Sequence, residues 1–169
     1  MVQMLGAILV AGGAAWLGFG AALSLRERGR ALENMAHGLA MLARELEMDE
    51  PPLPRLMERL IPRSRGPAKE LFQGCAKALD RLEQEEFSHA WQRLCAGQND
   101  IGEDGQQALI PLGELLGRST CREQVQGVKR VRERLLELAR QAGEDYRHQG
   151  KVYRTLGLSG GAFLVILLL

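Results

Sequence analysis

The chain has 169 residues, of which 46% are hydrophobic and 25% are charged, and its formal net charge is +1. This near-neutral balance, without a basic stripe carrying interleaved aromatic residues, gives no reason to expect a nucleic acid as partner. Cys75, Cys95 and Cys121 are widely spaced and fit neither a metal site nor a disulfide framework, so we expect buried thiols.

The first predicted element is a membrane helix at the N-terminus. Residues 4–25 form an uncharged apolar run, close to the ~20 residues that cross a bilayer core. A secretory signal has basic residues before a shorter apolar stretch, whereas here Arg26, Arg28 and Arg30 follow the run. We therefore expect residues 1–25 to be a retained transmembrane helix.

The middle of the chain, residues 26–154, has apolar residues at helical spacing and no convincing segment of period two. We therefore expect an all-α fold, a six-helix antiparallel bundle. The first helix should continue from the membrane to about Glu47, where the proline-rich turn at residues 51–54 stops it. The other five helices are expected over 54–61, 67–82, 87–96 and 108–116, and from 120 onward.

Three local features refine these boundaries. Residues 97–105 are polar and contain glycine, so they should form a loop. Pro111 within the fifth helix indicates a kink or a later helix start. Thr120 and Glu123 have the spacing of a capping box at the start of the last helix, which should run directly into a second membrane span.

The C-terminal run, residues 155–169, is uncharged and we expect it to be the second transmembrane helix. It is short for a span, but Lys151 and Arg154 can reach the headgroups and lengthen it. A re-entrant or buried core helix is the alternative. Because basic residues flank both spans on the side of residues 26–154, the positive-inside rule places this bundle in the cytoplasm.

Small residues recur within both predicted spans. Ala14, Gly18 and Ala22 repeat every fourth residue, and Gly157 and Gly161 form a GxxxG motif. Such stripes let membrane helices approach closely, so we expect these residues to pack helices together, although glycine and alanine are common in membrane helices anyway.

The search for catalytic chemistry gives no candidate. His37, His89 and His148 lack ligand spacing, and no HExxH, GxSxG or P-loop motif occurs. We expect no catalytic, cofactor-binding or metal-binding residues, and therefore no enzyme. The acidic cluster Glu45, Glu47, Asp49 and Glu50 could bind a cation or a basic partner, or could simply be a solvated helix end.

The order of several segments resembles the stage III sporulation protein AB family over essentially the whole chain. These segments are LGAILVAGGAAWLGFG, RELEMDEPPLPRL, Ala90-Trp91, LGELLGRS, Gln124 and KVYRTLGLSGGAFLVILLL. Two positions depart from the family pattern: Leu46 stands where isoleucine is common, and Thr120 where aspartate is frequent.

This resemblance implies a fold and a role. The family occurs in endospore-forming bacteria and is similar to the type II secretion F family, whose cytoplasmic domains are six-helix bundles. It implies a multi-pass platform in the outer forespore membrane, part of the complex joining mother cell and forespore, with its bundle facing the mother cell cytoplasm. It also implies a need for the protein in late forespore gene expression.

The implied partners are the stage III sporulation protein AA ATPase, which is similar to secretion motors, and other membrane proteins of the stage III complex. We expect the contact at Glu45, Glu47, Pro52 and Pro54. The alternatives are an oligomerising membrane scaffold without a motor, which would make a homo-oligomer, and a membrane-bound enzyme or small-ligand receptor with a pocket in the bundle.

Overall fold

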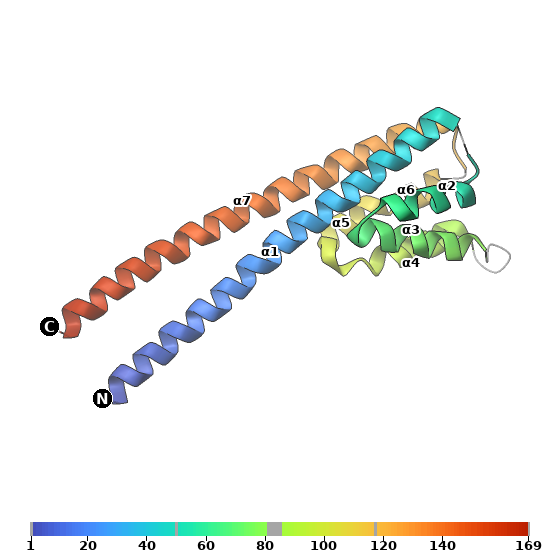
Figure 1. The fold of residues 1–169 in the computed structure, drawn as a ribbon. Helices are drawn as coiled ribbons and strands as arrows, with labels where there is room; N and C mark the ends of the chain where they lie inside the picture. The colour runs from blue at the N-terminus through green and yellow to red at the C-terminus, as the bar shows by residue number, and fades with distance from the viewer. Residues whose placement is uncertain (1, 50, 81–85, 117, 169) are drawn as a thin grey trace. The chain divides into compact units, whose positions relative to one another are not determined.

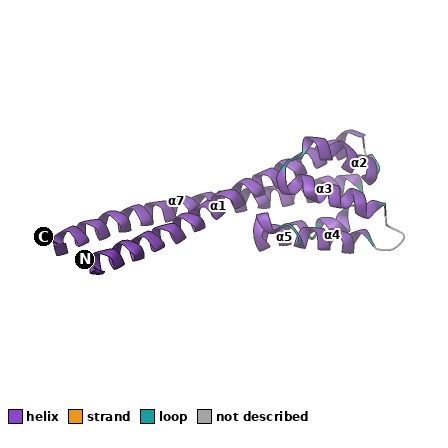
Figure 2. Ribbon diagram, turned by 60° about the horizontal axis from the view of Figure 1, so that its bottom comes forward, coloured by secondary structure: helices purple, strands orange, loops and turns teal. Residues whose placement is uncertain are grey.

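A computed structural model gives the structure of the chain (Figure 1). The backbone is described for residues 2–49, 51–80, 86–116 and 118–168. Side-chain surroundings are described for residues 23–48, 51–80, 86–116 and 118–148. Every element in these ranges is an α-helix or a 3₁₀ turn, which confirms the all-α prediction (Figure 2).

The chain forms two compact units. Unit 1 consists of Met1–Glu27 and Gln141–Leu169, and unit 2 is Arg28–Arg140. Two long helices, α1 (Val2–Asp49) and α7 (Cys121–Leu168), contribute to both units. The predicted continuation of the first and last helices is therefore confirmed.

Within the part of the chain whose side chains are described, no helix is both long and apolar enough to cross a membrane. Residues 1–22 of the first predicted span, and the whole second span over 155–169, lie outside that part. Both spans and the domain boundaries drawn from them remain predictions. The same holds for the predicted packing residues Ala14, Gly18, Ala22, Gly157 and Gly161.

Unit 2 contains five shorter helices between α1 and α7. They are α2 (Leu53–Leu60), α3 (Gly66–Leu79), α4 (Phe87–Ala96), α5 (Gly102–Leu109) and α6 (Leu112–Leu115), with 3₁₀ turns η1 (Ile61–Arg63) and η2 (Asn99–Ile101). The described residues thus form seven α-helices, and the predicted count of six is wrong. The helix predicted over 87–96 is confirmed at both ends by α4.

The extra helix arises in the segment 97–105, which was predicted to be a loop. Gly102 adopts a φ of 68°, a conformation that favours glycine, and this turns the chain from η2 into α5. The Gln106 side-chain amide then donates to the backbone carbonyls of Ala96 (3.2 Å) and Gln98 (3.1 Å). These bonds to the preceding segment stabilise α5, a helix that its few apolar residues do not predict.

Pro111 separates α5 from α6, as the sequence predicted. The Gly113 N–H donates to the carbonyl of Ile110 (3.1 Å), so it does not reach the carbonyl of Leu109 that a continuous α-helix would pair it with. That carbonyl instead accepts a bond from the indole Nε1–H of Trp91 (2.8 Å). Because Trp91 is fully buried, this bond satisfies two polar groups inside the bundle.

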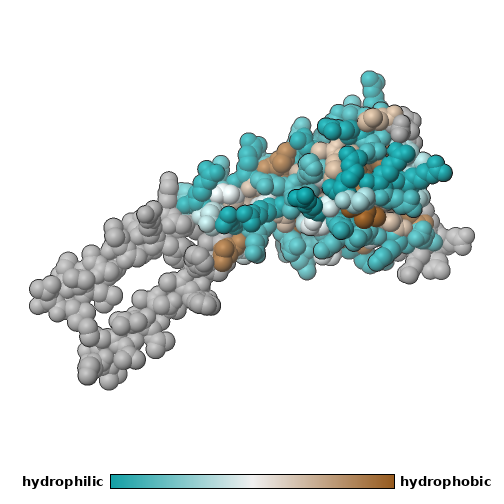
Figure 3. All heavy atoms as spheres, in the orientation of Figure 1, coloured by the Kyte–Doolittle hydropathy of each residue, from teal (hydrophilic) through white to brown (hydrophobic). Residues whose placement is uncertain are grey.

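The interior of unit 2 is close-packed. Its largest fully buried side chains are Trp91, Phe72, Leu32, Met35, Leu39, Leu42, Leu56, Met57, Leu60, Leu71, Ile101 and Leu109. A Cβ atom at Gly38 would lie 2.6 Å from the Cβ of Ala68, so α1 and α3 can approach this closely only because residue 38 is glycine. Hydrophilic side chains cover most of the visible face of the described residues (Figure 3).

Candidate functional site

The four predicted partner-binding residues lie at one end of unit 2, where α1 ends and α2 begins. We call residues 44–48 and 51–55 the α1–α2 corner. Pro52 and Pro54 are both exposed there. The carbonyl of Pro52 accepts the first helical bond from the N–H of Leu56 (3.1 Å), and Pro54 lies in the first turn, where its missing N–H breaks no helical bond.

Glu45 is engaged by two arginines of unit 2. Its carboxylate accepts a bond from Arg63 Nη1 at 2.6 Å and forms an ion pair with Arg59 Nη1 at 3.5 Å. Only 17% of the Glu45 side chain is exposed. This carboxylate therefore joins α1 to α2 and η1, and it would have to give up internal contacts to bind a partner.

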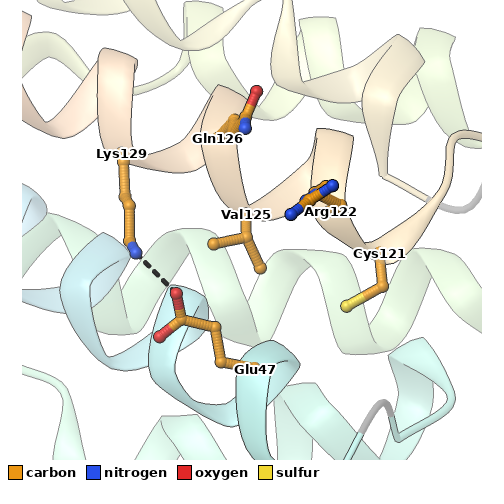
Figure 4. Close-up of a pocket in the computed structure, with 6 residues that line it drawn as sticks. All are labelled: Glu47, Cys121, Arg122, Val125, Gln126 and Lys129. Carbon is orange, nitrogen blue, oxygen red and sulfur yellow. Dashed lines mark hydrogen bonds and ion pairs between the residues drawn. The ribbon is translucent and has the colours of Figure 1, made fainter.

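Glu47 has a more open setting. Lys129 Nζ donates to its carboxylate at 2.5 Å, which joins the last turn of α1 to α7 (Figure 4). The side chains of both residues are about half exposed, at 46% for Glu47 and 53% for Lys129. An exposed pair of this kind contributes little to stability and can rearrange when a partner binds.

An open pocket of about 310 Å³ lies beside this ion pair (Figure 4). Its lining residues are Glu47, Cys121, Arg122, Val125, Gln126 and Lys129. Val125 is buried and gives the pocket an apolar wall, while the Cys121 thiol donates to the backbone carbonyl of Leu46 (3.2 Å). The pocket thus combines one apolar wall with a polar, charged rim.

The predicted capping box fixes the start of α7 beside this pocket. The N–H of Thr120 donates to Glu123 Oε2 (3.1 Å), and the N–H of Glu123 donates to Thr120 Oγ1 (3.4 Å). The Gln124 side-chain amide adds a bond to the carbonyl of Ser119 (2.9 Å). The prediction is confirmed, and the box orients the pocket residues that follow it.

The described residues offer little reactive chemistry. Burial raises the pKa of the Cys95 thiol to about 12, and it raises the pKa of Cys75 as well, with the nearby Cys95 adding to that shift. Neither thiol is a thiolate near neutral pH. In the part of the chain that the structure describes, no three His, Cys, Asp or Glu side chains converge in a way that could hold a metal ion.

Two surface features escaped the sequence reasoning. Met48, in the α1–α2 corner, is 74% exposed. It falls off the apolar stripe formed by Leu39, Leu42 and Leu46, which could have indicated its exposure. The second feature is a strip of three exposed arginines on α7, at residues 122, 130 and 134, which runs beside the buried Val125 and Val128.

Comparisons with known proteins agree with the resemblance drawn from the sequence. A family model described as stage III sporulation protein AB matches residues 3–169. A solved structure titled "Stage III sporulation protein AB (SpoIIIAB)" is 20% identical, with a TM-score of 0.62, over 72% of this chain and 97% of that one. At this identity the likeness establishes the fold alone. No curated protein matches the chain.

Proposed function

Because this chain belongs to the stage III sporulation protein AB family, we propose that it is a non-enzymatic membrane platform on which a motor ATPase docks. The observation that carries the proposal is the family match, which runs over residues 3–169. In this proposal the platform belongs to the complex between mother cell and forespore and is needed for late forespore gene expression. Its partners are the stage III sporulation protein AA ATPase and the other membrane proteins of that complex.

The proposal includes an arrangement in the membrane. Residues 1–25 and 155–169 span the outer forespore membrane, and the bundle, resembling that of the type II secretion F family, faces the mother cell cytoplasm. The uncharged ends and their basic flanks support this topology. A motor in the mother cell cytoplasm could then reach the α1–α2 corner.

The α1–α2 corner suits docking for physical reasons. Met48 offers a flexible apolar side chain that is already exposed, and Pro52 and Pro54 hold the adjoining backbone in a restricted conformation. The two prolines limit the backbone conformational entropy that would be lost when a partner covers this surface. Glu47 could exchange its exposed ion pair with Lys129 for a contact to the partner.

The test is a binding measurement between the purified ATPase and the full chain in detergent and in lipid nanodiscs. We expect saturable binding, and we expect Met48→Glu to weaken it by roughly tenfold because a charge would be buried at the contact. Ile110→Glu is the matched control, since Ile110 is also an exposed apolar residue (38%) but lies at the end of α5.

The two parts of the proposal can fail separately. If the wild-type chain shows no saturable binding in either membrane mimic, the platform function is wrong. If the wild type binds and Met48→Glu binds equally well, the docking surface is wrong and the function stands. Reversing the charge of Glu45 is a poor test, because it would break the ion pairs to Arg59 and Arg63 within the bundle.

A further inference from the structure

A row of basic side chains follows the exposed side of α7 in unit 2. Arg122, Gln126, Arg130 and Arg134 follow one another at four-residue steps and are all exposed. Three of the four are basic, and we call the strip the basic ridge. Residues four apart on a helix are neighbours on its surface, so the ridge is a continuous strip. At about 1.5 Å per residue it is roughly 18 Å long.

The ridge has an excess of positive charge that unit 2 does not neutralise. Within the described part of the chain, no ion pair or hydrogen bond engages Arg122, Arg130 or Arg134. On the same stretch of α7, Lys129 pairs with Glu47, and the exposed Glu123 accepts bonds from Thr120 in the capping box. Glu133 is a further exposed carboxylate beside the arginines. Arg130 and Arg134 are like charges four residues apart and repel each other, so an anionic occupant would stabilise this part of the ridge.

An acidic surface, opposite in charge to the ridge, lies elsewhere in unit 2. Asp100, Glu103 and Asp104 meet where η2 joins α5, and we call them the acidic corner. Asp104 forms an ion pair with Arg28 of α1 (3.2 Å). Asp100 and Glu103 are exposed, and no described residue pairs with them.

Among the described residues, no ion pair joins the ridge to the acidic corner within one copy. Glu47 of α1 contacts the middle of the ridge region through Lys129, whereas Arg28 of α1 contacts the acidic corner through Asp104.

We propose that two copies of the chain associate head to tail, with the basic ridge of one copy on the acidic corner of the next. Arginine forms paired hydrogen bonds with carboxylates, which gives such a contact direction as well as affinity. The contact is heterologous, because the two surfaces differ. Each added copy therefore leaves a new ridge or a new acidic corner exposed, and the assembly closes into a ring or extends as a row.

The test measures self-association of the full chain in detergent by sedimentation velocity over a range of protein concentrations. Two charge-reversed variants are compared with the wild type. The ridge variant carries Arg130→Glu and Arg134→Glu, and the corner variant carries Asp100→Lys and Glu103→Lys. We expect each variant alone to associate roughly tenfold more weakly than the wild type, because like charges now meet at the contact.

An equimolar mixture of the two variants provides the decisive measurement. The corner variant keeps a native ridge, and the ridge variant keeps a native acidic corner, so the mixture can form the native contact. We expect the mixture to form heterodimers through this one native contact, at concentrations where neither variant associates alone. Raising the salt concentration from about 50 mM to about 500 mM should weaken wild-type association. Recovery in the mixture also shows that both variants are folded.

A control variant separates the proposed contact from net charge. Arg65→Glu with Lys69→Glu changes the net charge as much as the ridge variant does, at exposed residues of unit 2 outside the ridge. We expect it to associate like the wild type. The proposal is overturned if the wild type stays monomeric at low salt, if the control weakens association as much as the ridge variant, or if the mixture fails to associate.

Vesicles containing anionic lipid give a further arm of the test. If the ridge variant loses vesicle binding while its self-association matches the wild type, the ridge is a lipid-binding surface and the proposal is wrong. The measurements do not involve the ATPase, so their outcome is independent of the proposed docking function.

Discussion

The interior of unit 2 and the end of unit 2 that carries the pocket, here the pocket end, are stabilised in different ways. In the interior, Trp91 is fully buried, hydrogen-bonded to a backbone carbonyl and in contact with a helix that approaches closely at Gly113. At the pocket end, the pair of Glu47 and Lys129 is about half exposed and charge replaces close packing. The interior should therefore respond strongly to changes of shape, while the pocket end should tolerate substitution and remain available for binding.

The largest effect is expected at Trp91. Trp91→Ala removes the largest buried side chain and leaves the carbonyl of Leu109 without its donor, so the free energy of unfolding should fall by about 3–5 kcal/mol. Thermal and urea unfolding followed by circular dichroism would measure it. Trp91→Phe, which keeps most of the packing but not the N–H, should cost less. A loss below about 1 kcal/mol for Trp91→Ala would show that Trp91 does not contribute to stability through its burial and its hydrogen bond.

Gly113→Ala tests the same region by adding one methyl group. Its Cβ would lie 2.7 Å from Cδ1 of Trp91, so we expect a loss of about 1–3 kcal/mol through overpacking. Gly97→Ala is the control, because the nearest atom to its Cβ is the carbonyl oxygen of Leu94 at 3.5 Å, an ordinary contact. Equal effects of the two substitutions on the unfolding midpoint would show that Trp91 does not restrict residue 113.

At the start of α7, Thr120→Ala should have a smaller effect. It removes one half of the capping box, which costs about 1 kcal/mol in comparable helices. Ser119→Ala is the matched control, since the backbone carbonyl of Ser119, and not its hydroxyl, accepts the bond from Gln124. Differential scanning calorimetry of the two variants should give a lower melting temperature for Thr120→Ala alone.

The smallest effects are expected for the ion pairs of the α1–α2 corner. Glu45→Gln weakens the contacts to Arg59 and Arg63 at a largely buried carboxylate, so it should cost up to about 1 kcal/mol. Glu47→Gln removes a half-exposed pair and should change stability by less than about 0.5 kcal/mol. If urea unfolding ranks them in the opposite order, burial does not distinguish the two glutamates.

Local sequence signals predicted much of the fold. The bounds of α4, the long first helix, the break at Pro111 and the capping box of Thr120 all follow from apolar spacing, proline and cap chemistry within a few residues. Helix α5 could not be predicted in this way. Its start depends on the positive φ of Gly102 and on bonds from Gln106 to carbonyls of the preceding segment.

The site was harder to predict because its contacts join distant residues. The acidic cluster at the end of α1 looked available to a partner, but the arginines that engage Glu45 belong to α2 and η1. The four-residue repeat of Arg130 and Arg134 is visible in the sequence, whereas the absence of partners for these side chains among the described residues becomes apparent only once the helices are placed.

The burial of two thiols has a practical consequence. Cys75 and Cys95 are enclosed and keep their protons, whereas Cys121 is partly exposed and lines the pocket. A thiol-reactive fluorophore added to the unaltered chain should therefore attach first at Cys121. Such a dye would sit at the mouth of the pocket, where its emission would change as a partner arrives, and a membrane-impermeant reagent would reveal which compartment that mouth faces.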